Sequence, residues 1–268
     1  MSTTMQGLMQ KKQFNLIEVL QHAATWNGDV EVVTNSVEGG IHRIGYADLY
    51  DRTCRLANAL NRLGIKAGDR VGTMAWNTWR HLECWYGLSG IGAICHTLNP
   101  RLFPDQIEYI VNHAQNRFIF VDTSFVAVIA NVLDKLPTLE GLVVMTAKEH
   151  MTDDMREIGI PVYCYEELLA TEDSDFVWPL FSADTASSLC YTSGTTGNPK
   201  GVLYSHRSNL NHAMITAHGD MFGLSARDSF LLIVPMFHAN GWGLPFSVPM
   251  VGGKLILPGP FMDGKSIY

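Results

Sequence analysis

A polar loop in the second half of the chain carries residue types that could bind phosphate. The stretch YTSGTTGNPKG, residues 191–201, holds four Ser/Thr hydroxyls, three glycines and one lysine. The candidate ligand-binding residues in it are Thr192, Ser193, Gly194, Thr195, Thr196, Gly197 and Lys200. The glycines let backbone N–H groups approach an anion closely, the hydroxyls add neutral donors, and the lysine adds a compact positive charge. This set of donors predicts a polyphosphate-binding loop.

The same loop has two competing interpretations. A Walker A loop needs glycine directly before the lysine and a hydroxyl directly after it. Here Pro199 precedes Lys200 and Gly201 follows it, which excludes that class of phosphate loop. The other interpretation is a solvated Ser/Thr/Gly turn, which composition alone does not exclude. The order of the residues favours phosphate binding.

Strand and helix patterns alternate along the chain before this loop. Residues 46–64 predict an amphipathic helix, because Leu49, Leu56, Leu60 and Leu63 share one face and Gly64 follows as a C-cap. Strands are expected near residues 70–75, 93–97, 117–122 and 142–146, and helices near 79–88, 104–113 and 125–136. This alternation predicts an α/β fold with layered, largely parallel sheets and helices on both faces.

The loop follows a strand-like run at residues 185–191, and the chain becomes helical again after Ser205 or His206. A polar, acidic break at residues 170–176 separates this part from the preceding strands and helices. We therefore expect an N-terminal α/β subdomain over residues 1–172. A partial second α/β subdomain over residues 173–268 would carry the phosphate loop.

Composition excludes several classes of protein. The formal net charge of -7, without a basic stripe, argues against nucleic acid as a partner. Five widely separated cysteines without a C-x-x-C pair argue against a disulfide framework and a zinc knuckle, so a cytoplasmic location is expected. The N-terminus lacks the apolar core of a signal peptide, and prolines and glycines interrupt the most apolar stretch, residues 230–257, so no transmembrane segment is expected.

YTSGTTGNPKG resembles the signature loop of the adenylate-forming enzymes, the superfamily of acyl-CoA synthetases, peptide-synthetase adenylation domains and firefly luciferase. Residues 75–122 and VPMFHANGWGLPFSVPMVGGKLILPGP, residues 234–260, resemble the fatty acyl-CoA ligase branch. The resemblance covers nearly the whole chain. It implies the fold of a partial N-terminal domain of an adenylate-forming enzyme.

The resemblance also implies a reaction. In the family, a substrate carboxylate attacks the α-phosphorus of ATP, pyrophosphate leaves, and the acyl group passes from AMP to the thiol of coenzyme A. The seven loop residues named above would then hold the β and γ phosphates. Lys200 would act as a point charge and not as a base.

A second motif, MFHANGWG at residues 236–243, is implied to lie beside the substrate. By resemblance, His238 screens or orients the carboxylate, so Lys200 and His238 are the candidate catalytic residues. Asn240, Gly241 and Trp242 join His238 in the implied substrate pocket, with Trp242 as a gate to the fatty-acid tunnel. The alternatives are a core histidine bonded to a backbone carbonyl and a buried tryptophan that fills the core.

Several parts of the family's machinery have no counterpart in residues 1–268. These are the glycine-threonine-glutamate motif that helps bind Mg²⁺, the aspartate that holds the ribose, the hinge, and the C-terminal domain with its catalytic lysine. The resemblance implies ATP, Mg²⁺ and coenzyme A for the whole reaction. We expect no metal site in this chain, an absent C-terminal domain, and a truncated chain whose activity alone stays open.

Three functions remain at this point. The HANGWG segment and its apolar surroundings favour a fatty acid over an amino acid as the carboxylic acid substrate. A ligase for methylthiopropionate, a short thioether acid, resembles the chain about as well. The third function is that of a noncatalytic fragment that folds and forms a homodimer.

Overall fold

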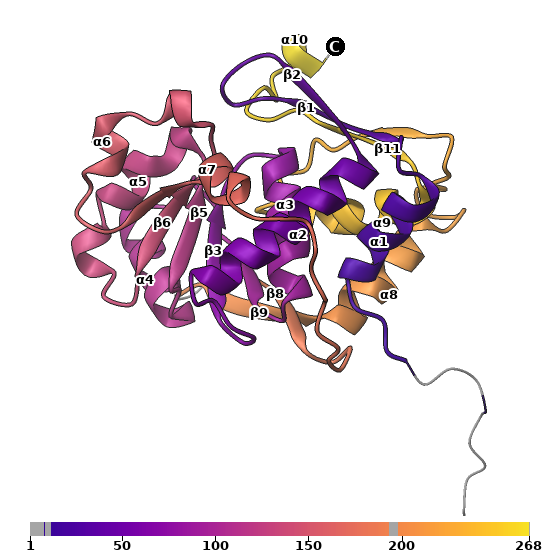
Figure 1. Cartoon of the computed structure of the whole chain (residues 1–268), viewed down its shortest axis with the longest axis horizontal. Coiled ribbons are helices and arrows are strands. Elements are labelled where there is room, and N and C mark those ends of the chain that lie inside the picture. The colour runs from indigo at the N-terminus through magenta and orange to yellow at the C-terminus, as the bar shows by residue number, and fades with distance from the viewer. Residues whose placement is uncertain (1–7, 9–11, 193–197, 268) are drawn as a thin grey trace, which may run out of the picture.

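The computed structural model describes residues 8, 12–192 and 198–267, which form two β-sheets surrounded by helices (Figure 1). In spatial order, the strands of the larger sheet are β7 (Val162–Cys164), β6 (Gly141–Val144), β5 (Phe118–Val121), β3 (Arg70–Met74), β4 (Ile94–Thr97), β8 (Ala186–Thr192) and β9 (Lys200–Ser205). Neighbouring strands run parallel except β8 and β9, which are antiparallel. The predicted largely parallel sheet is confirmed.

The smaller sheet joins the two ends of the described chain. Its strands, in spatial order, are β10 (Ser229–Leu231), β11 (Lys254–Leu257), β1 (Glu31–Asn35) and β2 (Ile41–Gly45). β11 lies parallel to β10 and β1, and β2 is antiparallel to β1. Both sheets therefore take strands from both sides of residue 172, and the division into subdomains at that residue stays a prediction.

Ten α-helices within the described ranges connect and cover these strands. They are α1 (Ile17–Trp26), α2 (Tyr46–Arg62), α3 (Trp79–Gly90), α4 (Pro104–Ala114), α5 (Val126–Ala130), α6 (Asp153–Arg156), α7 (Tyr165–Ala170), α8 (His206–Ala217), α9 (Leu244–Val251) and α10 (Gly264–Ile267). Helix α2 ends as predicted, because Gly64 takes the positive φ of 74° that a C-terminal glycine allows.

One predicted helix is wrong in its extent. Residues 125–136 form the short helix α5 between 3₁₀ turns at Thr123–Phe125 and Leu133–Lys135, not one continuous helix. Val126, Val128 and Ile129 fall in this segment, and β-branched side chains lose rotamer freedom in a helix. Burial of these side chains against the sheet holds the broken helix in place.

Alternating residues of the central strands cover both faces of the larger sheet. On β5, Phe118 and Phe120 pack in the cluster that contains α1, α2 and α3, whereas Ile119 and Val121 pack in the cluster that contains α4 and α5. Adjacent strand residues point to opposite faces, so a strand apolar at every position must be covered on both sides. The sequence-based prediction of helices on both faces is confirmed.

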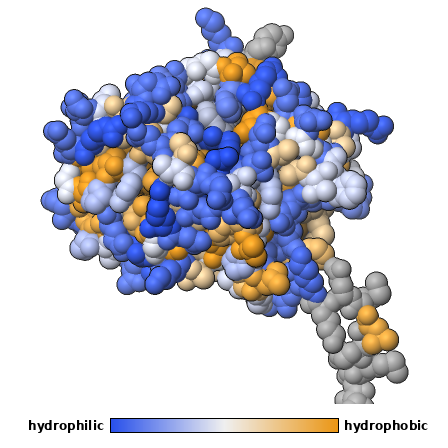
Figure 2. Space-filling model, viewed as in Figure 1, coloured by the Kyte–Doolittle hydropathy of each residue, from blue (hydrophilic) through white to orange (hydrophobic). Residues whose placement is uncertain are grey.

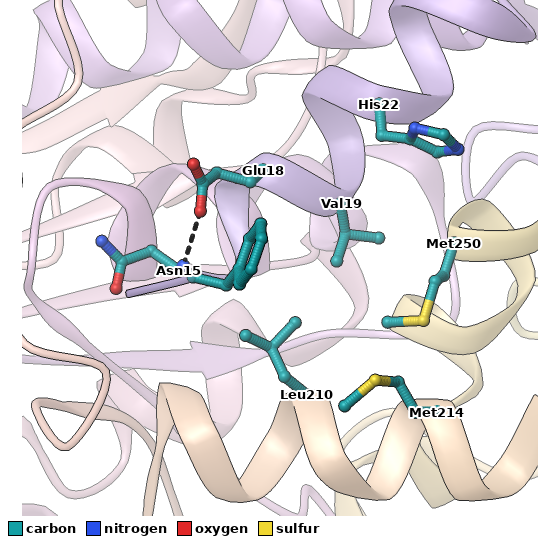
Figure 3. Close-up of a pocket in the computed structure, with 8 residues that line it drawn as sticks. Asn15, Glu18, Val19, His22, Leu210, Met214 and Met250 are labelled. Atoms are coloured by element: carbon teal, nitrogen blue, oxygen red, sulfur yellow. Dashed lines mark hydrogen bonds between the residues drawn. The ribbon is translucent and has the colours of Figure 1, made fainter. Parts of the chain in front are cut away.

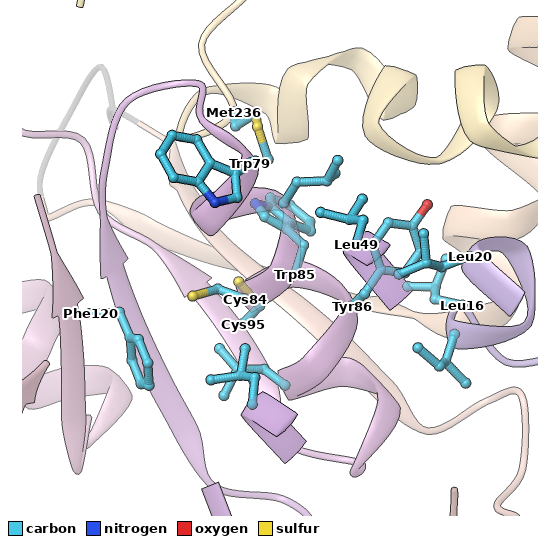
Figure 4. Packing of buried hydrophobic residues seen from close by; sticks show 14 of the residues in the cluster. Leu16, Leu20, Leu49, Trp79, Cys84, Trp85, Tyr86, Cys95, Phe120 and Met236 are labelled. Carbon is cyan, nitrogen blue, oxygen red and sulfur yellow. The ribbon is translucent and has the colours of Figure 1, made fainter. Parts of the chain in front are cut away.

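Helix α3 lies in the middle of the molecule, and every residue from Trp79 to Gly90 is buried. Figure 4 shows Trp85 and Tyr86 of this helix in the apolar core, with Leu49 of α2 nearby. The hydroxyl of Tyr86 donates a hydrogen bond of 2.8 Å to the carbonyl of Pro245 in α9. The helix therefore connects the larger sheet to the helix that follows the HANGWG segment.

Charged side chains on this buried helix are paired. Glu83 is fully buried, and its Oε1 lies 2.6 Å from Nε of Arg52 on α2. Arg52 also contacts Glu166 of α7 at 3.0 Å, and Arg80 of α3 contacts Glu166 at 2.7 Å and Glu38 at 2.5 Å. Burial raises the pKa of Glu83, and Arg52 opposes this shift. Burial alone would also raise the pKa of Glu166, but the two arginines outweigh it and lower that pKa.

The surface is mostly polar. Figure 2 shows a largely hydrophilic face with small apolar patches between the hydrophilic side chains. None of the helices in the described part of the chain has the length and apolar character needed to cross a bilayer.

Replacement of Arg52 tests the buried ion pairs. Arg52→Met should lower the free energy of unfolding by about 3–5 kcal/mol, because it leaves Glu83 as a buried carboxylate without its cation. The measurement is urea denaturation at pH 7. The control is Arg43→Ala, which removes a surface contact with Glu31 and should leave the midpoint almost unchanged. Equal small effects of both variants would contradict the role given to Arg52.

Candidate functional site

The two described ends of the predicted phosphate loop meet at the open end of a hairpin. Thr192 is the last residue of β8, Lys200 is the first of β9, and the two are paired across the strands. The hydroxyl of Thr192 lies 3.5 Å from the carbonyl oxygen of Lys200 and donates to it. Both side chains are exposed, so the lysine charge is accessible to an anion in solution. The predicted loop residues Ser193, Gly194, Thr195, Thr196 and Gly197 lie outside the described residues.

Helix α8 is fastened to the strand that ends in this loop. It begins at His206, as expected from the sequence, after Ser205, whose hydroxyl accepts a hydrogen bond of 3.1 Å from the N–H of Ser208. The side-chain amide of Asn209 donates hydrogen bonds of 3.0 Å to the hydroxyls of Ser187 and Ser188 on β8. This network positions β8 relative to α8.

The HANGWG segment forms a tight left-handed turn at Ala239–Gly243. Ala239, Asn240 and Trp242 have φ values of 46°, 53° and 56°, a conformation that costs roughly 1–2 kcal/mol for each residue other than glycine. Contacts must offset this strain. The side-chain amide of Asn240 donates a hydrogen bond of 3.4 Å to Ser188 Oγ, and Gly243 lies so close to His212 that an added Cβ would be 2.4 Å from Nδ1.

The contact between Asn240 and Ser188 brings the two motifs together. Ser188 lies on β8, four residues before Thr192, and its Oγ accepts hydrogen bonds from Asn209 of α8 and from Asn240 of the HANGWG turn. Sequence reasoning placed each motif separately. The structure shows that the HANGWG turn contacts β8, the strand that leads into the phosphate loop.

The predicted substrate-pocket residues divide into an exposed pair and a buried pair. His238 is exposed and Trp242 exposes 51% of its surface, whereas Asn240 and Gly241 are buried. The alternatives of a core histidine and a core-filling tryptophan are therefore wrong. The proposed roles of His238 at the carboxylate and of Trp242 as a gate stay predictions.

Asn77 supports this site and was missed by sequence reasoning. It is 1% exposed and lies just beyond the C-terminal end of β3. Its amide donates to the carbonyls of Leu232 and Val234 at 2.8 and 2.9 Å, and its side-chain oxygen accepts from the N–H of Met236 at 2.7 Å. One amide side chain thus fixes the backbone that leads to His238. An asparagine between tryptophans at a strand end, in AWNTW, was the available signal.

Asp122 is a second supporting residue that sequence reasoning did not single out. It follows β5, is 1% exposed, and its Oδ2 accepts a hydrogen bond of 2.7 Å from the N–H of Trp76. Burial raises the pKa of Asp122 to about 7. The Trp76 ring packs against Phe237, the neighbour of His238, with ring centroids 6.4 Å apart. The carboxyl group therefore supports an aromatic contact beneath the second motif.

Figure 3 shows a separate, mostly apolar pocket. It measures about 340 Å³ and is lined by Phe14, Asn15, Glu18, Val19, His22, Leu210, Met214 and Met250. These residues come from α1, the segment before it, α8 and α9. None of the predicted site residues lines it, so we assign the candidate site to the hairpin and the HANGWG turn.

The matching family model gives the class of this protein. The model described as AMP-binding enzyme matches residues 20–267. The chain belongs to the AMP-binding enzyme family, as its resemblance to the adenylate-forming enzymes implied.

Several relatives within this family are acyl-CoA ligases. The chain is 45% identical over 263 residues to a medium-chain-fatty-acid–CoA ligase of Ectopseudomonas oleovorans, covering 98% of this chain and 48% of the relative. It is 43% identical over 264 residues to a 3-methylmercaptopropionyl-CoA ligase of Ruegeria lacuscaerulensis, with the same coverages. A long-chain-fatty-acid–CoA ligase of Thermus thermophilus is 39% identical, covering 97% of this chain and 46% of the relative. The chain spans about half the length of these curated relatives.

Solved structures support the fold. The crystal structure of an anthranilate CoA ligase in complex with anthranoyl-AMP matches with a TM-score of 0.81 and 22% identity, covering 92% of this chain and 45% of that chain. A long-chain-fatty-acid-CoA ligase from Archaeoglobus fulgidus matches with a TM-score of 0.79 and 22% identity, covering 94% and 48%. The α/β architecture is therefore that of adenylate-forming CoA ligases.

Replacement of Asn77 should weaken the support of the second motif. Asn77→Ala leaves two carbonyls and one N–H without their partner, so we expect a loss of about 3 kcal/mol or more in the free energy of unfolding. Urea denaturation measures this loss. Asn58→Ala is the matched control, because Asn58 bonds backbone carbonyls at the surface. If both variants lose equally little, Asn77 does not hold the segment.

The pKa of Asp122 predicts a pH dependence of stability. Its pKa of about 7 in the folded protein lies above the ordinary value of 3.8, so the unfolded chain gives up this proton first. The contribution of protonated Asp122 to the free energy of unfolding is therefore complete below about pH 4, and it is lost as the pH rises through about 7. Asp122→Asn lacks this titration. As the pH rises from 4 to 7, its free energy of unfolding should therefore increase relative to that of the wild type, which urea denaturation measures. A constant difference across that range would refute the assignment.

Proposed function

We propose that this chain binds ATP and a carboxylic acid for the adenylation step of an acyl-CoA ligase. The observation that supports this most is the hydrogen bond between Asn240 and Ser188, which docks the HANGWG turn on the strand that ends at Thr192. A phosphate-binding loop and a carboxylate-binding motif must be close neighbours for the carboxylate to reach the α-phosphorus. Family membership supports the same reaction.

The hairpin supplies charge stabilisation in this proposal. Lys200 places a positive charge at the first residue of β9, and Thr192 places a hydroxyl at the end of β8. With the five loop residues between these strands, they would hold the β and γ phosphates of ATP and stabilise pyrophosphate as it leaves. Donors fixed in advance around developing negative charge are typically the largest contribution to such a reaction.

The HANGWG turn supplies the acid side of the proposed site. His238 would orient the substrate carboxylate, while Asn240 holds the turn against β8 and Gly241 takes the positive φ of 58° within the turn. Trp242 would cover the mouth of the acyl pocket, since its side chain is half exposed and glycines flank it. A swing of this ring would then admit the acid.

Mg²⁺ and coenzyme A are not given roles at these residues. Within residues 8, 12–192 and 198–267, no three His, Cys, Asp or Glu side chains gather as metal ligands. We therefore derive no step through Mg²⁺. The transfer to coenzyme A belongs to the full ligase reaction of the family.

The substrate is proposed from the relatives. The identities to ligases named for medium-chain fatty acids and for 3-methylmercaptopropionate are nearly equal, at 45% and 43%. The apolar residues of α9, next to Trp242, favour a fatty acid. A cytoplasmic location and a homodimer are further parts of this proposal.

Acid-dependent release of pyrophosphate tests the function. The chain, with ATP and Mg²⁺, should release pyrophosphate with octanoate, palmitate or methylthiopropionate, and the order of the rates identifies the acid. Lys200→Ala should lower the rate about 10²–10³-fold, because it removes one preorganised cation from the phosphates.

Lys148→Ala is the matched control, since Lys148 is an exposed lysine in a distant 3₁₀ turn. It should leave the rate unchanged. Pyrophosphate release that does not depend on the acid, or that survives Lys200→Ala, would contradict the proposed function. Light scattering on the same samples measures whether the chain is a homodimer, and a homodimer that releases no pyrophosphate would favour the noncatalytic fragment.

A further inference from the structure

One hydrogen bond connects helix α4 to the base of the phosphate hairpin. Nδ1 of His113, near the end of α4, lies 2.6 Å from the hydroxyl oxygen of Tyr191 on β8. Tyr191 directly precedes Thr192, the first residue of the predicted phosphate-binding set. Neither the family's implied roles nor the sequence patterns assign a task to His113 or to Tyr191.

Tyr191 spans both arms of the hairpin. It pairs with Gly201 across the strands, one position before the pair formed by Thr192 and Lys200. A Cβ added at Gly201 would lie 3.2 Å from Cζ of Tyr191 and 3.4 Å from its hydroxyl oxygen, so the ring lies over the glycine backbone. The position of this ring therefore affects both strands where they enter the loop.

Two further rings fix the orientation of Tyr191 and His113. The buried ring of His96 lies 5.2 Å from the Tyr191 ring, and its Nδ1 is 2.8 Å from the side-chain oxygen of Asn116. On the outer side, Tyr109 stacks on His113 with centroids 5.3 Å apart and an interplanar angle of 21°. Burial raises the pKa of Tyr191 to about 12, so its hydroxyl keeps its proton at neutral pH and stays a hydrogen-bonding partner for the His113 ring.

The hairpin needs this second support. Among the described strands, β9 pairs only with β8, and none of the residues of β9 is fully buried. Apart from the contact with α4, Thr192 and Lys200 are held at their spacing by the pairing of β8 and β9 and by the bond from the Thr192 hydroxyl to the Lys200 carbonyl. Helix α4, residues 104–114, which lies far from the hairpin in the sequence, supplies the additional constraint.

We propose that His113 is a positioning residue for the phosphate loop: through Tyr191 it holds the two ends of the loop at the spacing that binds the phosphates of ATP. This inference rests on the proposed function. It concerns ATP and not the carboxylic acid, because the contact lies at the hairpin and not at the HANGWG turn.

A double-mutant cycle tests the proposal. Tyr191→Phe and His113→Ala should each raise the KM for ATP about fivefold, the ratio that corresponds to one net hydrogen bond, and leave the KM for the acid unchanged. The double variant should be no worse than either single variant, because both remove the same bond. His113→Asn, whose side-chain amide offers both a donor and an acceptor in place of Nδ1, should keep the wild-type KM. His150→Ala, at an exposed histidine in the 3₁₀ turn Lys148–His150, is the control.

The outcomes separate this inference from the proposed function. If the fold-changes in KM of the two single variants multiply in the double variant, the role of His113 is overturned. Equal rises in KM for ATP and for the acid would overturn it as well. A wild-type chain without acid-dependent pyrophosphate release would contradict the proposed function, and calorimetric titration with ATP would then test the contact by the same fivefold change in Kd. A wild-type chain that binds no ATP would overturn both.

Discussion

A fully enclosed helix that carries charged residues is the constraint around which this molecule is built. Helix α3 has no exposed residue, yet it contains Arg80 and Glu83. An unpaired charge in such a place would cost several kcal/mol, so neighbouring elements must supply partners. Arg52, Glu166 and Glu38 do so from α2, α7 and the loop between β1 and β2, and these contacts fix the layers on either side of α3.

The candidate site depends on this arrangement indirectly, through the elements that α3 contacts. The enclosed helix bonds α9 through Tyr86 and Pro245, and the HANGWG turn directly precedes α9. The strand β8, which leads into the phosphate loop, pairs with β4 of the same sheet. Asn77 extends the support from the end of β3 to the segment before His238, and Ser188 connects the HANGWG turn to the hairpin. The site is thus built on rigid strands and helices, while its strained left-handed turn is held by side-chain contacts.

Much of the fold could be predicted from the sequence, because apolar periods and glycine positions are local signals. The alternation of strands and helices, the start of α8 and the glycine after α2 all follow from such signals. The break in 125–136 could not be predicted, since burial against the sheet overrides a helical period. The loop and HANGWG motifs were visible as patterns. Asn77, Asp122 and the contact of Asn240 with Ser188 were not, because their roles depend on residues far away in the sequence.

The smaller sheet has a consequence for the synthesis of the chain. Strand β1 pairs with β11, so Val32 lies beside Leu255. At translation rates of 5–20 residues per second, β1 leaves the ribosome roughly 10–45 s before its partner is made. During that interval the edge of β1 that faces away from β2 has no strand to pair with. Nascent chains of this protein should therefore pass through a period in which the hairpin β1–β2 is available to chaperones or to other chains.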